Sequence, residues 1–193
     1  MIASIVNVIA VVGFALSMLA GNLFGSYLAS LFIAFSLVVM LCAFAHFSNE
    51  NGQVAGLSGL AFGAMYALCN SIVYFTQMTT VRTDNLTQQA AALLDFQNFG
   101  LMFNYDMLGY CLMDIATFFA GLTIEAKTKT DKWLKGLLLI HGVFAIACFL
   151  MPLLGIFSTD MGGGEWIGTA VLEFWCIYFI PIGILSFLHF KNK

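Results

Sequence analysis

The stretch NYDMLGYCLMDIATFFAGL, residues 104–122, is apolar enough to lie in lipid, yet it contains two aspartates, Asp106 and Asp114. At about 3.6 residues per helical turn, both acids fall on one stripe that also carries Tyr110, Thr117 and Gly121. The other faces of this helix are mostly Leu, Ile, Met and Phe. Ionisable residues in a membrane span normally face the interior of a bundle. We therefore expect this helix to turn the stripe inward, against other helices.

The composition of the whole chain also indicates a membrane protein. Hydrophobic residues make up 61% of the 193 residues and charged residues only 9%, whereas a soluble domain carries about 25% charged residues. No linker rich in proline, serine or charge divides the chain. We therefore expect one integral membrane domain, residues 1–193, of all-α class. The net charge of −3 without a basic stripe argues against nucleic acid as a partner.

Six stretches are long enough to cross a bilayer, for which about 20 apolar residues in a helix suffice. The polar segment 79–97 is expected to be a loop outside the membrane, part of which could form an amphipathic helix. The sequence thus predicts a bundle of six transmembrane helices within the lipid bilayer. The spans are expected at roughly 2–20, 28–47, 54–77, 98–123, 134–156 and 167–190.

The lysines are concentrated on one side of this bundle. Four lie between the fourth and fifth spans and two follow the sixth, while the single arginine, Arg82, lies on the opposite side. Because basic residues mark the cytoplasmic side, both termini are expected in the cytoplasm of a multi-pass protein of the cell membrane. The opposite side is expected to carry four acidic residues: Asp84, Asp95, Asp160 and Glu165.

The polar residues inside the spans sort into two layers by depth. A rise of about 1.5 Å per residue places Asp106 and Glu173 roughly 7 Å on the outer side of the midplane. Two carboxylates in a site of low dielectric constant could hold a proton, or bind a cation or an amine between them. We therefore expect a substrate-binding layer made of Asn70, Tyr74, Asp106, Tyr110, Trp166 and Glu173.

The inner layer is expected to pair Asp114 with His141, each roughly 5 to 6 Å on the inner side of the midplane. A carboxylate beside an imidazole orients it or keeps it charged, so this pair could act as a proton relay or gate. His46 and His189 lie at helix ends, where we expect them to be interfacial anchors. Neither H-x-x-x-H nor H-E-x-x-H occurs, so neither a metal site nor a cofactor is expected.

These features favour a small-solute membrane transporter, or a solute-binding membrane subunit, with an outward-facing polar cavity that could be coupled to protons or cations. One alternative is a membrane-embedded enzyme that uses an Asp/Glu/His acid–base pair on a lipid-like substrate. The sequence contains no nucleophile or metal motif that would require an enzyme. Another is a non-catalytic sensor, immunity or assembly protein, in which the acids only join helices. A homo-oligomer or a partner membrane subunit is compatible with each hypothesis.

Overall fold

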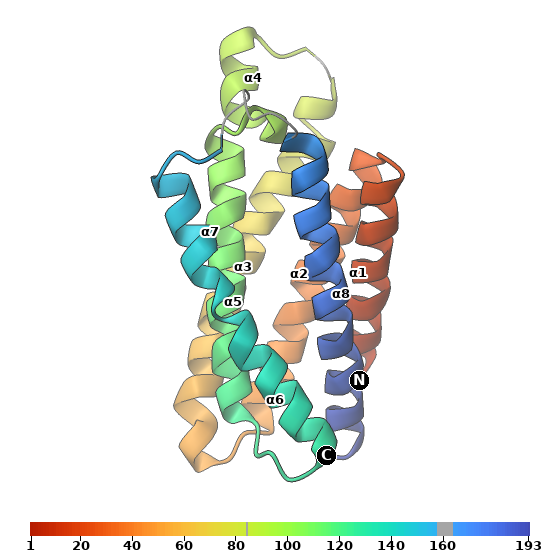
Figure 1. Cartoon of the computed structure of the whole chain (residues 1–193), viewed down its shortest axis with the longest axis vertical. Helices are drawn as coiled ribbons and strands as arrows, with labels where there is room; N and C mark the ends of the chain where they lie inside the picture. Colours follow the sequence, from red (N-terminus) through yellow and green to blue (C-terminus); the bar gives the residue numbers. More distant parts are fainter. Residues whose placement is uncertain (84, 158–163) are drawn as a thin grey trace.

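The chain forms a bundle of helices that stand side by side along one long axis (Figure 1). The computed structural model describes residues 1–83, 85–157 and 164–193, with the side chains of residues 164 and 165 left undescribed. Within those ranges all regular structure is helical. Five segments are helical, long and apolar enough to cross a membrane, which fits a multi-pass membrane protein. They are Ile2–Leu19, Leu23–His46, Glu50–Thr83, Lys129–Leu153 and Trp166–Lys191.

Both termini lie at one end of the bundle, which we call the terminal end, and α4 lies at the opposite end, which we call the cap end (Figure 1). Asp84 and Asp160, both expected at the side of Arg82, lie outside the described residues. The long helices are α1 (Ile2–Leu19), α2 (Leu23–His46), α3 (Gln53–Met78), α5 (Leu101–Thr123) and α8 (Gly164–Lys191). The shorter elements are η1 (Glu50–Gly52), η2 (Val81–Thr83), α4 (Gln88–Leu94), η3 (Phe96–Asn98), α6 (Lys129–His141) and α7 (Phe144–Leu153).

The turn between α1 and α2 is shorter than the expected spans 2–20 and 28–47 indicate. Gly21 has φ of +66°, a left-handed conformation that glycine adopts without strain and that reverses the chain quickly. Asn22 then caps α2, because its side-chain oxygen accepts the backbone N–H of Gly25 at 3.0 Å. The helix therefore begins at Leu23, and Gly25, expected in a loop, belongs to its first turn.

The stretch expected as one helix over 134–156 is divided into α6 and α7, and the break falls at Gly142 and Val143. Gly142 lies so close to α5 that a Cβ atom there would be 2.6 Å from the Cβ of Phe118. Only glycine allows that approach. The break thus lies well before Pro152, which is near the end of α7.

The helix α6 also begins earlier than expected, at Lys129, because Thr128 and Asp131 form a capping box. Thr128 Oγ1 accepts the backbone N–H of Asp131 at 3.1 Å, and Asp131 Oδ2 accepts the backbone N–H of Thr128 at 3.0 Å. Two backbone donors that a helix start leaves free are satisfied in this way. The capping box fixes where the chain enters α6.

The helix α5 is the most central element. It packs most extensively on α3 and also contacts α2, α6 and α7. Its stripe is buried as expected, with Asp106, Asp114 and Thr117 each at most 2% exposed. On α3, small residues admit the neighbouring helices: a Cβ at Gly59 would lie 3.1 Å from the carbonyl oxygen of Ala116 in α5. Close backbone approach of this kind is how membrane helices gain packing contacts.

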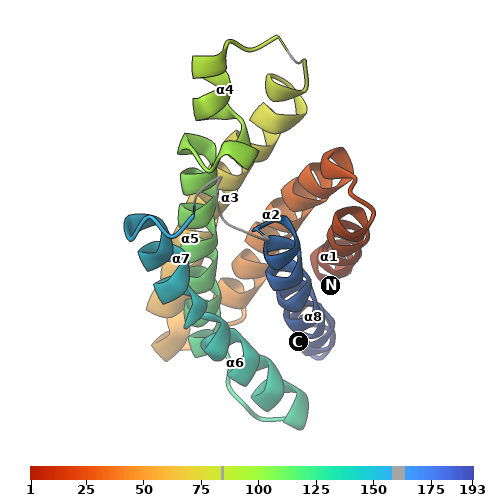
Figure 2. The same ribbon diagram turned by 45° about the horizontal axis from the view of Figure 1, so that its top comes forward.

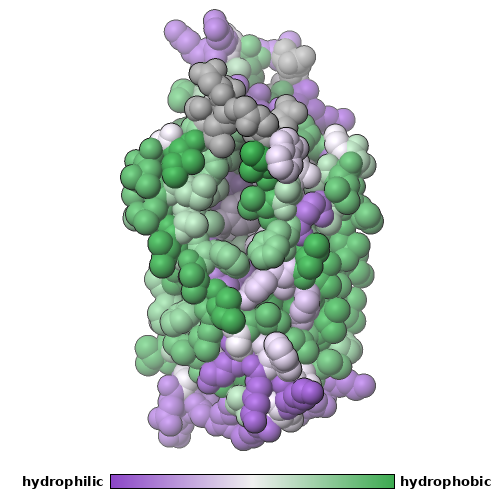
Figure 3. Space-filling view, viewed as in Figure 1, coloured by the Kyte–Doolittle hydropathy of each residue, from purple (hydrophilic) through white to green (hydrophobic). Residues whose placement is uncertain are grey.

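The remaining helices close the bundle differently at its two ends. At the terminal end α6 packs on α8, whereas α7 packs on α5 and contributes no buried residue of its own. The turned view in Figure 2 shows α8 beside α1 and α2, and α7 beside α5. Figure 3 shows an apolar belt around the middle of the visible face, with hydrophilic residues gathered at both ends of the molecule.

Gly56→Ala should destabilise the protein by about 1 to 3 kcal/mol, the usual range for overpacking. A Cβ atom at Gly56 would lie 2.7 Å from the backbone Cα of Ala45, so α2 and α3 would have to separate. Gly13→Ala is the matched control, because nothing lies within 4 Å of a Cβ there, and it should stabilise α1 by up to about 1 kcal/mol. Thermal unfolding in detergent measures both. Equal unfolding midpoints for the two variants would show that α2 and α3 are not tightly packed.

Candidate binding site in the bundle interior

The first group of site residues surrounds Asp106 at the interface of α3 and α5. Tyr74 donates its hydroxyl hydrogen to Asp106 Oδ2 at 3.1 Å, and the hydroxyls of Tyr74 and Tyr110 are 3.2 Å apart. Since the Tyr74 hydrogen points to the carboxylate, Tyr110 is the donor to the Tyr74 oxygen. Asp106 is only 2% exposed, and its Oδ1 atom is buried without a hydrogen-bond partner. Three expected site residues are therefore together, with one acceptor left free.

The other three residues expected in this layer do not share one position; they are Asn70, Glu173 and Trp166. Asn70 is fully buried one turn before Tyr74, beside Gly109 of α5, and its Oδ1 atom has no hydrogen-bond partner. Glu173 in α8 is partly buried, and its Oε1 atom also lacks a partner. In the described part of the chain no hydrogen bond or ion pair joins Glu173 to Asp106. Trp166 is 68% exposed and lies on the surface of α8.

The segment expected as an outer loop covers the Asp106 group at the cap end. Phe96 of η3 packs on Tyr74 and Tyr27, with ring centroids 6.3 and 6.4 Å away. Gln77 of α3 holds this segment in place: its Nε2 donates to the carbonyl of Leu94 at 2.7 Å, and its Oε1 accepts the N–H of Phe96 at 3.1 Å. We call residues 88–98, which include α4 and η3, the cap. The cap leaves the Asp106 group closed to solvent.

The second group joins Asp114 of α5 to His141, the last residue of α6. His141 Nδ1 lies 3.1 Å from Asp114 Oδ1 and 2.9 Å from Thr117 Oγ1. On its other side, Trp175 of α8 donates its indole N–H to His141 Nε2 at 3.0 Å. Asp114 Oδ2 is buried without a hydrogen-bond partner, and the Cys148 side chain of α7 lies beside this carboxylate. The group connects α5, α6 and α8 at the break in the fifth span.

These contacts assign the proton of the His141 ring. An indole N–H is only a donor, so His141 Nε2 must be the unprotonated acceptor. Nδ1 then carries the hydrogen and shares it between Asp114 and Thr117. Thr117 accepts there, since its own hydroxyl hydrogen goes to the Asp114 carbonyl at 2.9 Å. The imidazole is therefore neutral, and it places no positive charge beside Asp114.

Trp175 and Tyr66 are interior residues that the sequence reasoning missed. Trp175 contacts both groups, because its ring also meets Tyr110 edge to face at a centroid distance of 6.3 Å. Tyr66 of α3 is buried within electrostatic reach of Asp106 and Asp114. A usable signal existed for Trp175: a tryptophan in mid-span needs an acceptor for its N–H when it is buried. Tyr66 carried no comparable signal.

A third acid, Asp131, shows a contrasting and fully satisfied environment. Besides the capping box, its Oδ1 lies 2.6 Å from His189 Nδ1 of α8. His189, expected as an interfacial anchor, is buried in the last turn of α8 and packs near Phe44, with ring centroids 6.0 Å apart. The pair ties α6 to α8 at the terminal end. Both Asp131 oxygens thus have partners, unlike those of Asp106.

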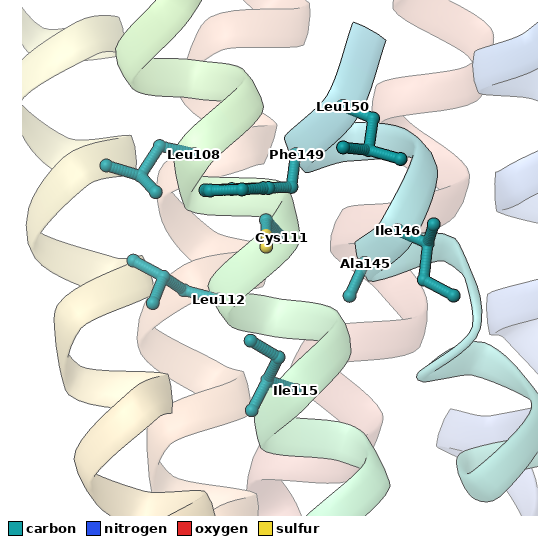
Figure 4. Close-up of a pocket in the computed structure, with 8 residues that line it drawn as sticks. All are labelled: Leu108, Cys111, Leu112, Ile115, Ala145, Ile146, Phe149 and Leu150. Atoms are coloured by element: carbon teal, nitrogen blue, oxygen red, sulfur yellow. The ribbon is translucent and has the colours of Figure 1, made fainter. Parts of the chain in front are cut away.

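An apolar groove of about 440 Å³ lies outside the polar groups, between α5 and α7 (Figure 4). Figure 4 shows side chains of both helices lining this groove, and none of them is charged. Its chemistry suits hydrocarbon and gives no polar contact to a solute. The lining residues are Leu108, Cys111, Leu112, Ile115, Ala145, Ile146, Phe149 and Leu150.

Trp175→Phe should release His141 Nε2 while keeping an aromatic ring in place. In the wild type, ¹⁵N NMR of the imidazole should show Nδ1 protonated and Nε2 bare from about pH 5 to 8, the range in which an ordinary histidine changes charge. In the variant the ¹⁵N shift of Nε2 should move toward that of a nitrogen without a hydrogen-bond donor, and stability should fall by about 1 kcal/mol for the lost hydrogen bond.

Trp133→Phe is the control for that measurement, because Trp133 is 61% exposed. This variant should leave the imidazole spectrum and the unfolding midpoint unchanged. A doubly protonated His141 in the wild type at neutral pH would contradict the assigned tautomer.

Three comparisons with known proteins give no relative for this chain. No family model matches the sequence, no curated protein matches it, and no solved structure matches the fold. The functional assignment therefore rests on the side-chain geometry of the two interior groups.

Proposed function

We propose that the protein is a small-solute transporter of the cell membrane, or the solute-binding membrane subunit of one, with six spans and both termini in the cytoplasm. Besides the five apolar segments, α5 is the fourth span along the chain; it is 23 residues long and so extends about 34 Å at 1.5 Å per residue. Its inward polar stripe makes it less apolar than α1 and α2. The six lysines of the terminal end, against the single Arg82 at the cap end, support the orientation.

The observation that carries the proposal is the unpaired Oδ1 atom of Asp106. A carboxylate inside a membrane bundle costs several kcal/mol on insertion unless it is paired or lies in a wet cavity. An acid retained only to join helices would be expected to use both oxygens, as Asp131 does. Asp106 uses only one. The free oxygen is available to a solute.

In this proposal the cap is the outer gate of the site. Gln77 and the aromatic contacts of Phe96 close the cap over Tyr74. Neither α4 nor η3 contains a buried residue, so the cap can open without disturbing the core. Opening would make Asp106 and Asn70 reachable from outside.

The group around Asp114 is the inner gate. Its hydrogen bonds join α5, α6 and α8 below the Asp106 group and close the bundle toward the terminal end. Since both His141 nitrogens are engaged, the pair holds the helices together and does not accept a further proton in this state. Proton or cation coupling is therefore assigned to the carboxylates of Asp106 and Asp114.

Asp106→Asn tests the proposal directly. The substitution replaces an acid whose Oδ1 atom has no partner with a neutral isostere, so the unfolding midpoint should stay equal or rise, while solute binding and transport are lost. Asp131→Asn is the matched control. It replaces an acid whose two oxygens both have partners, and it should lower stability by about 1 to 3 kcal/mol. Detergent thermal unfolding measures both effects, and solutes are screened on the wild type. A ligand at 100 times its Kd adds about 2.7 kcal/mol of stability.

The outcomes separate the hypotheses. If Asp106→Asn destabilises as much as Asp131→Asn and no solute stabilises the wild type, the acids are helix contacts and the transporter proposal is wrong. If a lipid copurifies and is chemically converted by the wild type but not by the variant, the protein is an enzyme.

Gln77→Ala should loosen the cap without affecting the core. Both hydrogen bonds to residues 94 and 96 are lost, so hydrogen exchange of residues 88–98 should speed up by roughly ten-fold, which corresponds to about 1.4 kcal/mol. Exchange in α3 and α5 should remain as slow as in the wild type. Thr79→Val is the control, because Thr79 only bonds to its own helix at Phe75. Unchanged exchange in the cap of Gln77→Ala would rule out the outer gate.

A further inference from the structure

Four of the expected site residues have a buried oxygen without a partner, and each of these oxygens can accept a hydrogen bond. They are carbonyl or carboxylate oxygens from three helices, and three of the four residues are at most 2% exposed. Whatever completes these groups must therefore bring hydrogen-bond donors or positive charge. The four atoms are Asn70 Oδ1, Asp106 Oδ1, Asp114 Oδ2 and Glu173 Oε1.

No positive side chain of the protein is positioned to do this. All seven basic residues fall either in the segment at the cap end or near the terminal end. Arg82, the only one at the cap end, lies over the ring of Phe24 at 4.8 Å. His141 is neutral, because Trp175 occupies its Nε2 atom. The interior oxygens thus have no internal counter-ion.

The walls around Asp106 are aromatic. Tyr74 contacts Asp106 directly, and Tyr110 is connected to it through the Tyr74 hydroxyl. The ring of Tyr27 stacks on Tyr74 with centroids 5.4 Å apart, and Trp175 meets Tyr110 edge to face. Aromatic faces attract ammonium groups, most strongly where water is excluded. A metal cation prefers several oxygen or nitrogen ligands, and the described residues contain no group of three or more acidic, histidine or cysteine side chains that could hold one.

We propose that the solute is an organic ammonium ion, either a protonated amine or a quaternary amine. Its charge pairs with Asp106 and its carbon atoms pack against Tyr74, Tyr110 and Trp175. This inference rests on the proposed function and names the substrate class of the same site. It explains why the interior combines unsatisfied oxygens with aromatic rings and has no basic residue.

The test uses pairs of probes that differ only in charge, on the full-length protein in lipid nanodiscs. One pair is butylammonium and n-butanol, and the other is choline and its uncharged carbon isostere, a dimethylbutanol. Butyrate and sodium chloride represent an anion and an inorganic cation. Binding is measured by the quenching of tryptophan fluorescence and by the shift in unfolding midpoint.

Both ammonium probes are expected to bind at least about ten-fold more tightly than their neutral partners, a difference of about 1.4 kcal/mol. Asp106→Asn should remove that difference, and Tyr110→Leu should weaken choline binding by a similar factor. Glu125→Gln changes an exposed acid at the terminal end and should leave the affinities unchanged. If Asp106→Asn does not fold, Tyr110→Leu alone decides the aromatic contribution.

The results distinguish this inference from the proposal beneath it. The ammonium class is wrong if charged and neutral partners bind with equal affinity. It is also wrong if only butyrate or only the alcohols bind in a way that depends on Asp106. Either result would still leave a solute-binding protein. Binding of sodium alone would assign the site to an inorganic cation and also overturn the inference. If no probe of any charge binds, both the substrate class and the solute-binding function fall.

Discussion

The structure depends on one constraint: polar groups placed among membrane helices must find partners inside the protein, because lipid provides none. The stripe of α5 concentrates this demand. Asp106 reaches Tyr74 of α3, and Asp114 and Thr117 reach His141 of α6. Hydrophobic burial does not drive membrane helices together, since lipid tails are as apolar as leucine. The polar contacts of α5 therefore fix which helices become its neighbours and in what rotation.

The way each acid is satisfied separates structural from functional roles. Asp131 uses both oxygens, in the capping box of α6 and in the contact with His189. Asp106 and Asp114 each keep one oxygen unpaired, although both are more deeply placed along α5. An unpaired buried acceptor lowers stability by about 1 to 3 kcal/mol. The proposed solute site would account for the presence of such an oxygen at two positions of one stripe.

Much of the architecture follows from the sequence, because hydropathy and helical periodicity are local properties. The all-α class and the inward stripe of α5 are confirmed, and the pairing of Asp114 with His141 is reproduced by a 3.1 Å contact. The sequence does not show which helices lie side by side, or which face each helix turns toward its neighbours. Depth alone grouped Trp166 with Asp106, yet Trp166 is on the surface, because equal depth on two helices says nothing about rotation. Depth could not find Gln77 either, since its partners lie in the cap.

The break in the fifth span gives the two halves of the bundle unequal freedom. Below Gly142, α6 is fixed by the capping box, by His189 and by the hydrogen bonds of His141. Above it, α7 has no buried residue and touches mainly α5 across an apolar groove. Moving α7 therefore breaks mainly apolar contacts with α5, whereas moving α6 breaks three sets of hydrogen bonds. Discontinuous helices beside a midplane site are a device by which membrane proteins open one side of a site while the other stays closed. Here α7 adjoins Asp114 through Cys148, so a shift of α7 would change the surroundings of this carboxylate without breaking the hydrogen bonds between α6 and α8.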